Sequence, residues 1–159
     1  MLFKESEILD VFTQICLAIK HIHDRKIVHR DIKSHNIFLD SNGFVKLGDF
    51  GIAICLNYTL DKVQGGIIGT PYYLSPEVIH NKPYSFKSDI WSLGVLLYEI
   101  CALKMPFDAN NIPLLSLKII KGTYNSLPIS YSAELRSLIK SMLNIDETKR
   151  PNINEILSK

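Results

Sequence analysis

The sequence HRDIKSHN at residues 29–36 decides how the rest of the chain is interpreted, because it places a carboxylate, an ammonium group and a carboxamide in one short segment. Asp31 can accept a proton from a hydroxyl group, and Lys33 can neutralise the charge of a phosphate. Asn36 offers a neutral oxygen of the kind that Mg2+ accepts as a ligand. The segment therefore predicts phosphoryl-transfer chemistry.

A second candidate metal ligand follows in the sequence DFG at residues 49–51. Between the two segments lie short apolar runs at 37–40 and 44–47, joined by the turn-forming sequence SNG. This pattern favours a tight β-hairpin. Because the hairpin would bring Asp49 back beside Asn36, we expect the two side chains to converge on one cation.

Length and charge limit the other classes of function. The chain has 159 residues, of which 47% are hydrophobic, so one globular domain with a substantial core is expected. Its 18 basic and 16 acidic side chains nearly balance, for a net charge of +2. We therefore expect neither a nucleic-acid partner nor a membrane partner.

The cysteines and the first residues indicate a location inside the cell. Cys16, Cys55 and Cys101 are odd in number, far apart and without metal-ligand spacing, so buried reduced thiols are favoured over a disulfide or a metal site. No apolar run reaches the ~20 residues that span a bilayer. The opening sequence MLFKESEILD carries acids, unlike a signal or transit peptide. We expect a soluble protein that is cytoplasmic or otherwise intracellular.

The first helix is predicted from apolar residues at three- and four-residue steps, with Ser6 as its cap and its end near His23. The apolar positions are Ile8, Leu9, Phe12, Ile15, Cys16, Ile19 and Ile22. His21 and His23 point in different directions on such a helix, so they do not predict a metal site.

Later residues predict further helices. The run 88–103 is apolar nearly all round, which indicates a helix at the centre of the domain, with Ser88 as its cap. Three more are expected at 114–121, at 133–143 and from Ile153 onward. Gly122 ends the first of these, and Asn152 with Glu155 forms a capping box for the last.

These motifs together resemble eukaryotic-type protein kinases, whose catalytic loop and metal-binding triplet have the form of residues 29–36 and 49–51. The sequence GTPYYLSPE at 69–77 resembles the end of their activation segment. Within kinases, SHNIFL at 34–39 and KSDIW at 87–91, together with LGDFG and GTPYYLSPE, are similar to the NIMA-related (NEK) family. The resemblance covers residues 1–159 as a carboxyl-terminal lobe: mainly α-helical, with a small β-hairpin beside the catalytic loop.

The resemblance implies transfer of the ATP γ-phosphate to serine or threonine of a protein substrate. It assigns Asp31 to orienting the substrate hydroxyl and Lys33 to contacting the phosphate. Thr70 would form hydrogen bonds to the side chains of Asp31 and Lys33. The Mg2+ ligands would be Asn36 and Asp49. The implied nucleotide-binding residues are Lys33, Asn36, Phe38 and Asp49.

Other residues have structural or regulatory roles in the resembled family. His29 would pack against Phe50, which Gly51 follows in the metal-binding triplet. Arg30 would receive a phosphate from the activation segment. Asp89 would hold the backbone of the catalytic loop, although a plain helix-dipole role is open.

The pair of Glu77 and Arg150 would anchor the activation segment to the helical core. A solvated surface charge remains the alternative for Arg150. For residues 69–77, a proline-punctuated turn without a recognition role remains the alternative to a substrate shelf.

Residues 52–64 lack clean periodicity, and the glycines at 65, 66 and 69 favour a loop that can switch state. Gly66 aligns where NEK kinases carry a phosphorylatable threonine. Between Asp49 and Glu77, Thr59 is the one plausible Ser/Thr phosphate acceptor outside the substrate shelf. We therefore expect control without phosphate at the usual position.

Nothing before residue 29 resembles a glycine-rich phosphate loop, the strand lysine of kinases or the adenine hinge. A missing amino-terminal lobe is thus an implied partner, besides the protein substrate. The alternative is a catalytically incompetent kinase-like fragment that binds proteins through 69–77 and the outer helices. A small-molecule phosphotransferase is disfavoured by 69–77, whose role in the family is peptide recognition. By family resemblance, association with the cytoskeleton, cilium or nucleus is also open.

Overall fold

The computed structural model describes residues 2–56 and 70–159. Its α-helices are α1 (Glu5–Asp24), α2 (Pro76–Ile79), α3 (Phe86–Ala102), α4 (Ile112–Lys121), α5 (Ala133–Met142) and α6 (Ile153–Leu157). The strands are β1 (Ile27–Val28), β2 (Ile37–Leu39), β3 (Val45–Leu47) and β4 (Ile54–Cys55). Short 3-10 helices cover Ser34–Asn36, Pro71–Tyr73 and Glu147–Lys149. This is the predicted helical lobe with a hairpin beside the catalytic loop.

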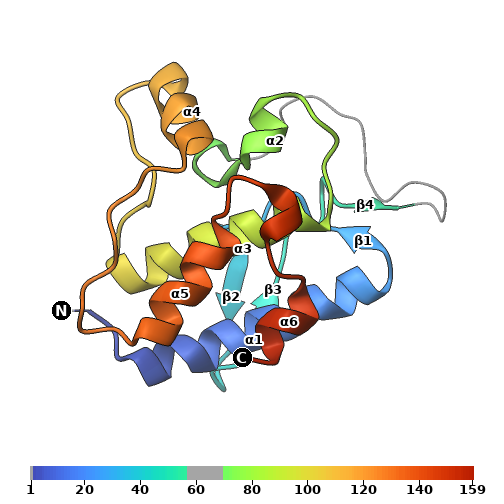
Figure 1. The fold of residues 1–159 in the computed structure, drawn as a ribbon. Helices are drawn as coiled ribbons and strands as arrows, with labels where there is room; N and C mark the ends of the chain where they lie inside the picture. Colours follow the sequence, from blue (N-terminus) through green and yellow to red (C-terminus); the bar gives the residue numbers. More distant parts are fainter. Residues whose placement is uncertain (1, 57–69) are drawn as a thin grey trace.

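Helix α3 runs through the centre of the molecule (Figure 1). Its residues are buried on all sides, as the apolar run predicts, and it packs against both α1 and α5. Gly94 allows the close approach of α5, because a Cβ at this position would lie 2.9 Å from the Cβ of Met142. The fold is therefore organised around one fully covered helix.

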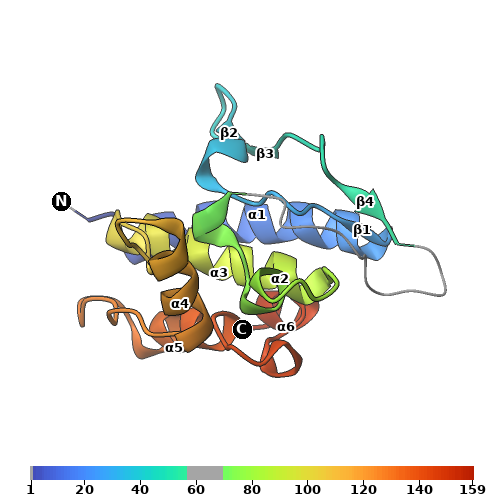
Figure 2. The same ribbon diagram turned by 90° about the horizontal axis from the view of Figure 1, so that it is seen from above.

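Helix α1 separates the hairpin from the helical body. It contacts α3 and α6 as well as β3, and in Figure 2 the hairpin lies on the side of α1 away from α4 and α5. The carbonyl oxygen of the Gln14 side chain accepts a hydrogen bond of 3.0 Å from the backbone N–H of Val45. The hairpin is thus fixed to the core through α1.

The β2–β3 hairpin is antiparallel and pairs Ile37 with Leu47. Asp40 closes its turn, since its Oδ1 accepts hydrogen bonds of 2.9 Å from the N–H groups of Asn42 and Phe44. A second antiparallel pair, β1 with β4, was not predicted. Two residues per strand are too few to give a periodic signal.

Two predicted caps are wrong. Helix α1 begins at Glu5 after Lys4, whose N–H donates to the Glu7 carboxylate at 2.9 Å, so Ser6 lies inside the helix. The cap of α3 is Ser85, whose Oγ accepts from the N–H of Lys87 at 3.2 Å. Ser88 is the third helical residue, and its hydroxyl instead donates to Glu77 at 2.8 Å.

Two of the three thiols are buried as expected, but Cys55 is exposed. Burial raises the pKa of Cys16 and of Cys101 to about 12, so both stay protonated. In the described residues, no helix has the length and apolar character needed to cross a membrane.

Candidate active site

The fully buried Asp89 forms hydrogen bonds to the backbone of the catalytic loop. Its Oδ2 accepts from the N–H of His29 at 2.9 Å, and its Oδ1 accepts from the N–H of Arg30 at 3.0 Å. Burial alone would raise the pKa of Asp89, but hydrogen bonds and the nearby His23 lower it below its ordinary value. The ionised carboxylate therefore fixes the start of the loop to α3.

Asp89 has two further hydrogen-bond partners that the sequence did not predict. The Nε2 of His23 lies 2.9 Å from Oδ2, and the Tyr84 hydroxyl donates to Oδ1 at 2.8 Å. A usable signal was present, because His23 follows Ile19 by four residues and continues the buried face of α1.

His29 is buried and packs at 4.8 Å between ring centroids against Phe50. Its Nε2 lies 3.1 Å from the carbonyl oxygen of Gly48, while Nδ1 accepts from the N–H of Asp31 at 3.3 Å. Both contacts are satisfied by the tautomer with its proton on Nε2. His29 thereby links the catalytic loop to the DFG segment by packing and hydrogen bonding.

Asp31 stands at the centre of a cluster of polar side chains. Its Oδ2 accepts from Lys33 Nζ at 2.6 Å and from Asn36 Nδ2 at 3.1 Å. The Thr70 hydroxyl lies 3.3 Å from Oδ1 and accepts from Lys33 at 3.1 Å. Burial opposes ionisation, yet the bonds to Lys33, Asn36 and Thr70 hold the pKa of Asp31 below its ordinary value. An ionised, oriented carboxylate beside an ammonium group results.

Asn36 and Asp49 are brought together as the hairpin predicts, because the N–H of Gly48 donates to the backbone oxygen of Asn36 at 2.9 Å. Asn36 uses its Nδ2 toward Asp31, which leaves Oδ1 for a cation. Asp49 has a positive φ of 57° and directs Oδ1 to the N–H of Gly51 at 3.2 Å. Its second oxygen, Oδ2, has no hydrogen-bond or ion-pair partner among residues 2–56 and 70–159.

The oxygen atoms of Asn36 and Asp49 are of the kind that hard divalent cations such as Mg2+ bind. No group of three His, Cys, Asp or Glu side chains that could hold a metal occurs within residues 2–56 and 70–159. Mg2+ commonly takes one or two protein oxygens and fills the remaining positions with phosphate oxygens and water. The amide oxygen of Asn36 and the carboxylate of Asp49 match that need.

Phe38 lies on β2 with 54% of its surface exposed, and Phe50 has 47% exposed. The Phe38 ring lies so close to Gly48 that an added Cβ would be 2.6 Å from its Cε2. Glycine at this position therefore lets an aromatic face lie next to Asp49. Both exposed rings therefore lie next to the segment that contains Asp49, Phe38 through its contact with Gly48 and Phe50 as the following residue.

Arg30 is 8% exposed, and its backbone has a positive φ of 71°. Its guanidinium lies 5.9 Å from the centre of the Tyr84 ring, and Nε finds no hydrogen-bond partner in the described part of the chain. The expected regulatory positions Thr59, Gly66 and the other loop glycines lie outside the described residues. The role of Arg30 as a phosphate receiver stays a prediction.

Glu77 and Arg150 form a buried bidentate pair. The Nη1–Oε1 and Nη2–Oε2 distances are 2.7 and 2.8 Å, and the two residues are 5% and 1% exposed. Arg150 also lies 4.9 Å from the centre of the Trp91 ring and donates to the backbone oxygen of Asn144 at 2.7 Å. A solvated surface position for Arg150 is therefore excluded.

This pair predicts a specific loss of stability in acid. Burial would raise the pKa of Glu77, but Arg150 and Ser88 lower it below its ordinary value of 4.5. The unfolded chain therefore takes up the proton first, so the stabilisation is fully present above about pH 4.5 and is lost as the pH falls through the folded-state pKa. Urea unfolding between pH 3 and 6 measures the free energy of unfolding, which should depend less on pH in the Glu77→Gln variant than in the unchanged protein.

The control is Glu134→Gln, which removes an exposed carboxylate in the first turn of α5. It should keep the pH dependence of the unchanged protein. Equal acid sensitivity of the Glu77→Gln variant and the unchanged protein would show that Glu77 does not carry this effect.

Comparisons with known proteins agree with the motifs. The protein kinase domain family matches residues 1–159. The chain is 56% identical over 158 residues to the serine/threonine-protein kinase Nek1 of Mus musculus, covering 99% of this chain and 13% of that protein. It is 54% identical over 160 residues to Nek5 of Homo sapiens, covering 100% of this chain and 22% of that protein.

A third relative comes from a distant organism. The chain is 56% identical over 159 residues to the probable serine/threonine-protein kinase nek3 of Dictyostelium discoideum, covering 98% of this chain and 14% of that protein. In all three comparisons the chain spans less than a quarter of the relative's length.

Proposed function

The chain belongs to the protein kinase family, and we propose that it forms the carboxyl-terminal lobe of a NEK-type serine/threonine kinase that transfers the ATP γ-phosphate to protein hydroxyl groups. The observation that carries this proposal is the cluster of Lys33, Asn36 and Thr70 around the ionised carboxylate of Asp31. Transfer of a phosphoryl group depends mainly on positioning and on charge neutralisation. Both are present in this cluster.

Each side chain has a separate part in the reaction. Asp31 accepts the hydrogen bond of the substrate hydroxyl and takes its proton while the oxygen–phosphorus bond forms and the bond to the leaving diphosphate breaks. Lys33 lies on the same carboxylate and meets the transferred phosphate. Thr70 keeps both groups in place through its hydroxyl.

Nucleotide and metal would be held by the residues on the hairpin side of the cluster. Asn36 and Asp49 would supply the protein oxygens for Mg2+, which would neutralise charge on the phosphates. Lys33 would contact the phosphate, and the exposed ring of Phe38 would face the nucleotide. Residues 70–77 would receive the peptide substrate.

The proposal includes a second, amino-terminal lobe that covers this face. The exposed Phe38 and Phe50 rings support it, because exposed aromatic side chains grouped beside a site commonly mark a contact surface. We propose an intracellular location for the complete protein.

Residues 1–159 alone should bind Mg-ATP weakly. Asn36 and Asp49 supply two metal ligands, while nothing before residue 29 resembles the groups that grip adenine and the inner phosphates. Calorimetric titration of the purified chain should show no saturable heat of binding at micromolar concentrations of Mg-ATP. A micromolar dissociation constant that Asp49→Asn abolishes would contradict the need for a second lobe.

The non-catalytic alternative makes the same prediction for the isolated chain, so the two functions separate only in the complete protein. There a kinase labels a serine peptide from γ-labelled ATP and leaves the matched alanine peptide unlabelled. An interaction module labels neither peptide.

A further inference from the structure

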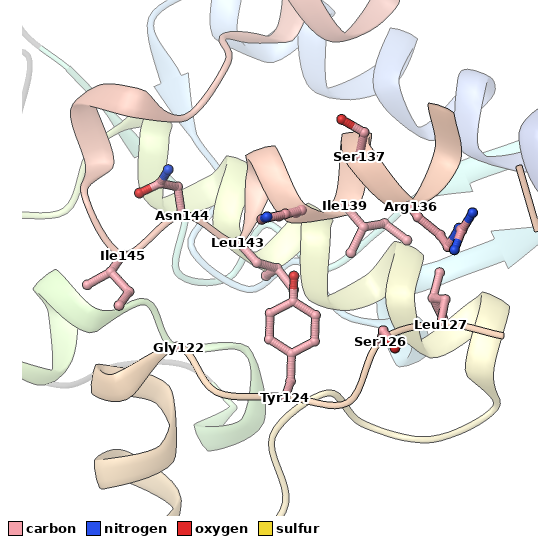
Figure 3. Close-up of a pocket in the computed structure, with 11 residues that line it drawn as sticks. Gly122, Tyr124, Ser126, Leu127, Arg136, Ser137, Ile139, Leu143, Asn144 and Ile145 are labelled. Atoms are coloured by element: carbon pink, nitrogen blue, oxygen red, sulfur yellow. The ribbon is translucent and has the colours of Figure 1, made fainter. Parts of the chain in front are cut away.

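A cavity of about 710 Å3 lies between α5 and the segment that follows α4, and none of its lining residues belongs to the catalytic loop. Figure 3 shows Tyr124 in the middle of this cavity, between Arg136 on one side and Asn144 with Ile145 on the other. The lining residues are Gly122, Tyr124, Ser126, Leu127, Arg136, Ser137, Ile139, Lys140, Leu143, Asn144 and Ile145.

The floor of the cavity is apolar. Leu127, Ile139 and Leu143 are 5%, 2% and 4% exposed, and Ile145 with 48% exposed forms one end. Gly122 ends α4 with a φ of 61°, and a Cβ there would lie 2.7 Å from the Ile145 side chain. Glycine thus lets Ile145 close this end, so an apolar side chain of a ligand has a place to bind.

The walls carry hydrogen-bond donors and positive charge. The Nε of Arg136 donates a hydrogen bond of 3.2 Å to the backbone oxygen of Ser132. Its Nη groups, the Lys140 ammonium and the Tyr124 hydroxyl make no hydrogen bond within the described residues. Burial raises the pKa of Tyr124, so its hydroxyl stays protonated.

No lining residue in the described chain is Asp or Glu. The two cations therefore have no carboxylate partner among the residues that line the cavity. A negatively charged ligand would supply the missing partner.

The spacing of the donors indicates the form of the ligand. Arg136 and Lys140 are one helical turn apart, about 6 Å along α5. Asn144 follows the end of α5 and lies on the other side of Tyr124 from Arg136 (Figure 3). An extended peptide covers ~11 Å with three to four residues. A single phosphate group would fill only a small part of a cavity of about 710 Å3 and would leave its apolar floor uncovered.

We propose that this cavity docks an acidic peptide segment of a partner protein, with an apolar side chain on the floor and carboxylates at Arg136 and Lys140. The segment binds away from the catalytic loop and from residues 70–77. Docking would therefore attach a partner to the lobe without occupying the transfer site.

The test uses a panel of labelled nonapeptides with Leu, Ile, Phe or Tyr at the centre and Asp or Glu at the flanking positions. Fluorescence anisotropy with residues 1–159 should show binding by at least one member, and 0.5 M NaCl should weaken it. Lys140→Glu should weaken that binding about tenfold, and Lys140→Gln by a smaller factor. Replacing the central residue by Ala should also weaken it.

Lys46→Glu is the matched control, since it makes the same charge change on an exposed side chain of the hairpin, on the opposite side of α1 (Figure 2). It should leave binding unchanged, and thermal melts check that all variants fold. The proposal is overturned if no peptide binds, if binding survives Lys140→Glu, or if only inorganic phosphate or anionic phosphatidylserine vesicles bind through Lys140.

Discussion

Asp31→Asn should lower the rate of phosphoryl transfer by the complete, two-lobed protein by about a hundredfold to ten-thousandfold. The amide keeps the size of the side chain but cannot take the proton of the substrate hydroxyl. It also loses the charge that holds Lys33, whose Nζ lies 2.6 Å from Oδ2. Single-turnover transfer from γ-labelled ATP to a serine peptide measures the effect on the chemical step.

The fold should survive this substitution, because the main-chain anchors of the loop run to Asp89 and not to Asp31. Asp10→Asn removes an exposed carboxylate of α1 and is the matched control, with unchanged rate and melting temperature. An Asp31→Asn protein that kept most of the transfer rate would show that the catalytic assignment is wrong.

Arg150→Ala should cost about 3–5 kcal/mol of unfolding free energy, because it leaves the Glu77 carboxylate charged, buried and without its partner. Three further acceptors lose their donor as well: the backbone oxygens of Lys87, Asn144 and Ile145. Since a domain of this size is stable by only about 5–15 kcal/mol, the variant should melt far lower or express in insoluble form.

Lys149→Ala is the control, one residue away. Its ammonium lies 3.7 Å from Asp146, and its side chain is 70% exposed, so the loss should stay below about 1 kcal/mol. Denaturant unfolding of both variants separates the two effects. If the Arg150 and Lys149 variants melted alike, the buried pair would carry no special share of the stability.

Much of the site could be predicted from the sequence because its residues are close together in the chain. Asp31, Lys33 and Asn36 lie within six residues, and one hairpin with a turn signal separates them from Asp49. The distant pair of Glu77 and Arg150 came from family resemblance alone. Nothing in the local pattern of either residue names its partner.

The contacts of Asp89 show what local patterns miss. His23 and Tyr84 reach the carboxylate from α1 and from the residues before α3. The periodicity of α1 indicates that His23 is buried, but no residue near His23 or Tyr84 in the sequence names Asp89 as the partner. The caps failed for a related reason. Ser85 and Ser88 are both good capping residues. Ser85 caps α3, and Ser88, as the third helical residue, accepts from the N–H of Ser85 at 3.3 Å while its hydroxyl donates to Glu77.

The shared carboxylate of Asp89 also bears on how the lobe opens. It joins the end of α1, the start of the catalytic loop and the beginning of α3, so none of these can separate without exposing an unpaired charge inside the core. The catalytic loop thus belongs to the same cooperative unfolding unit as α3, although it lies in irregular chain. The hairpin that carries Phe38 is joined to this unit through α1, by the hydrogen bond of Val45 to Gln14, and makes no bond to Asp89 itself in the described part of the chain.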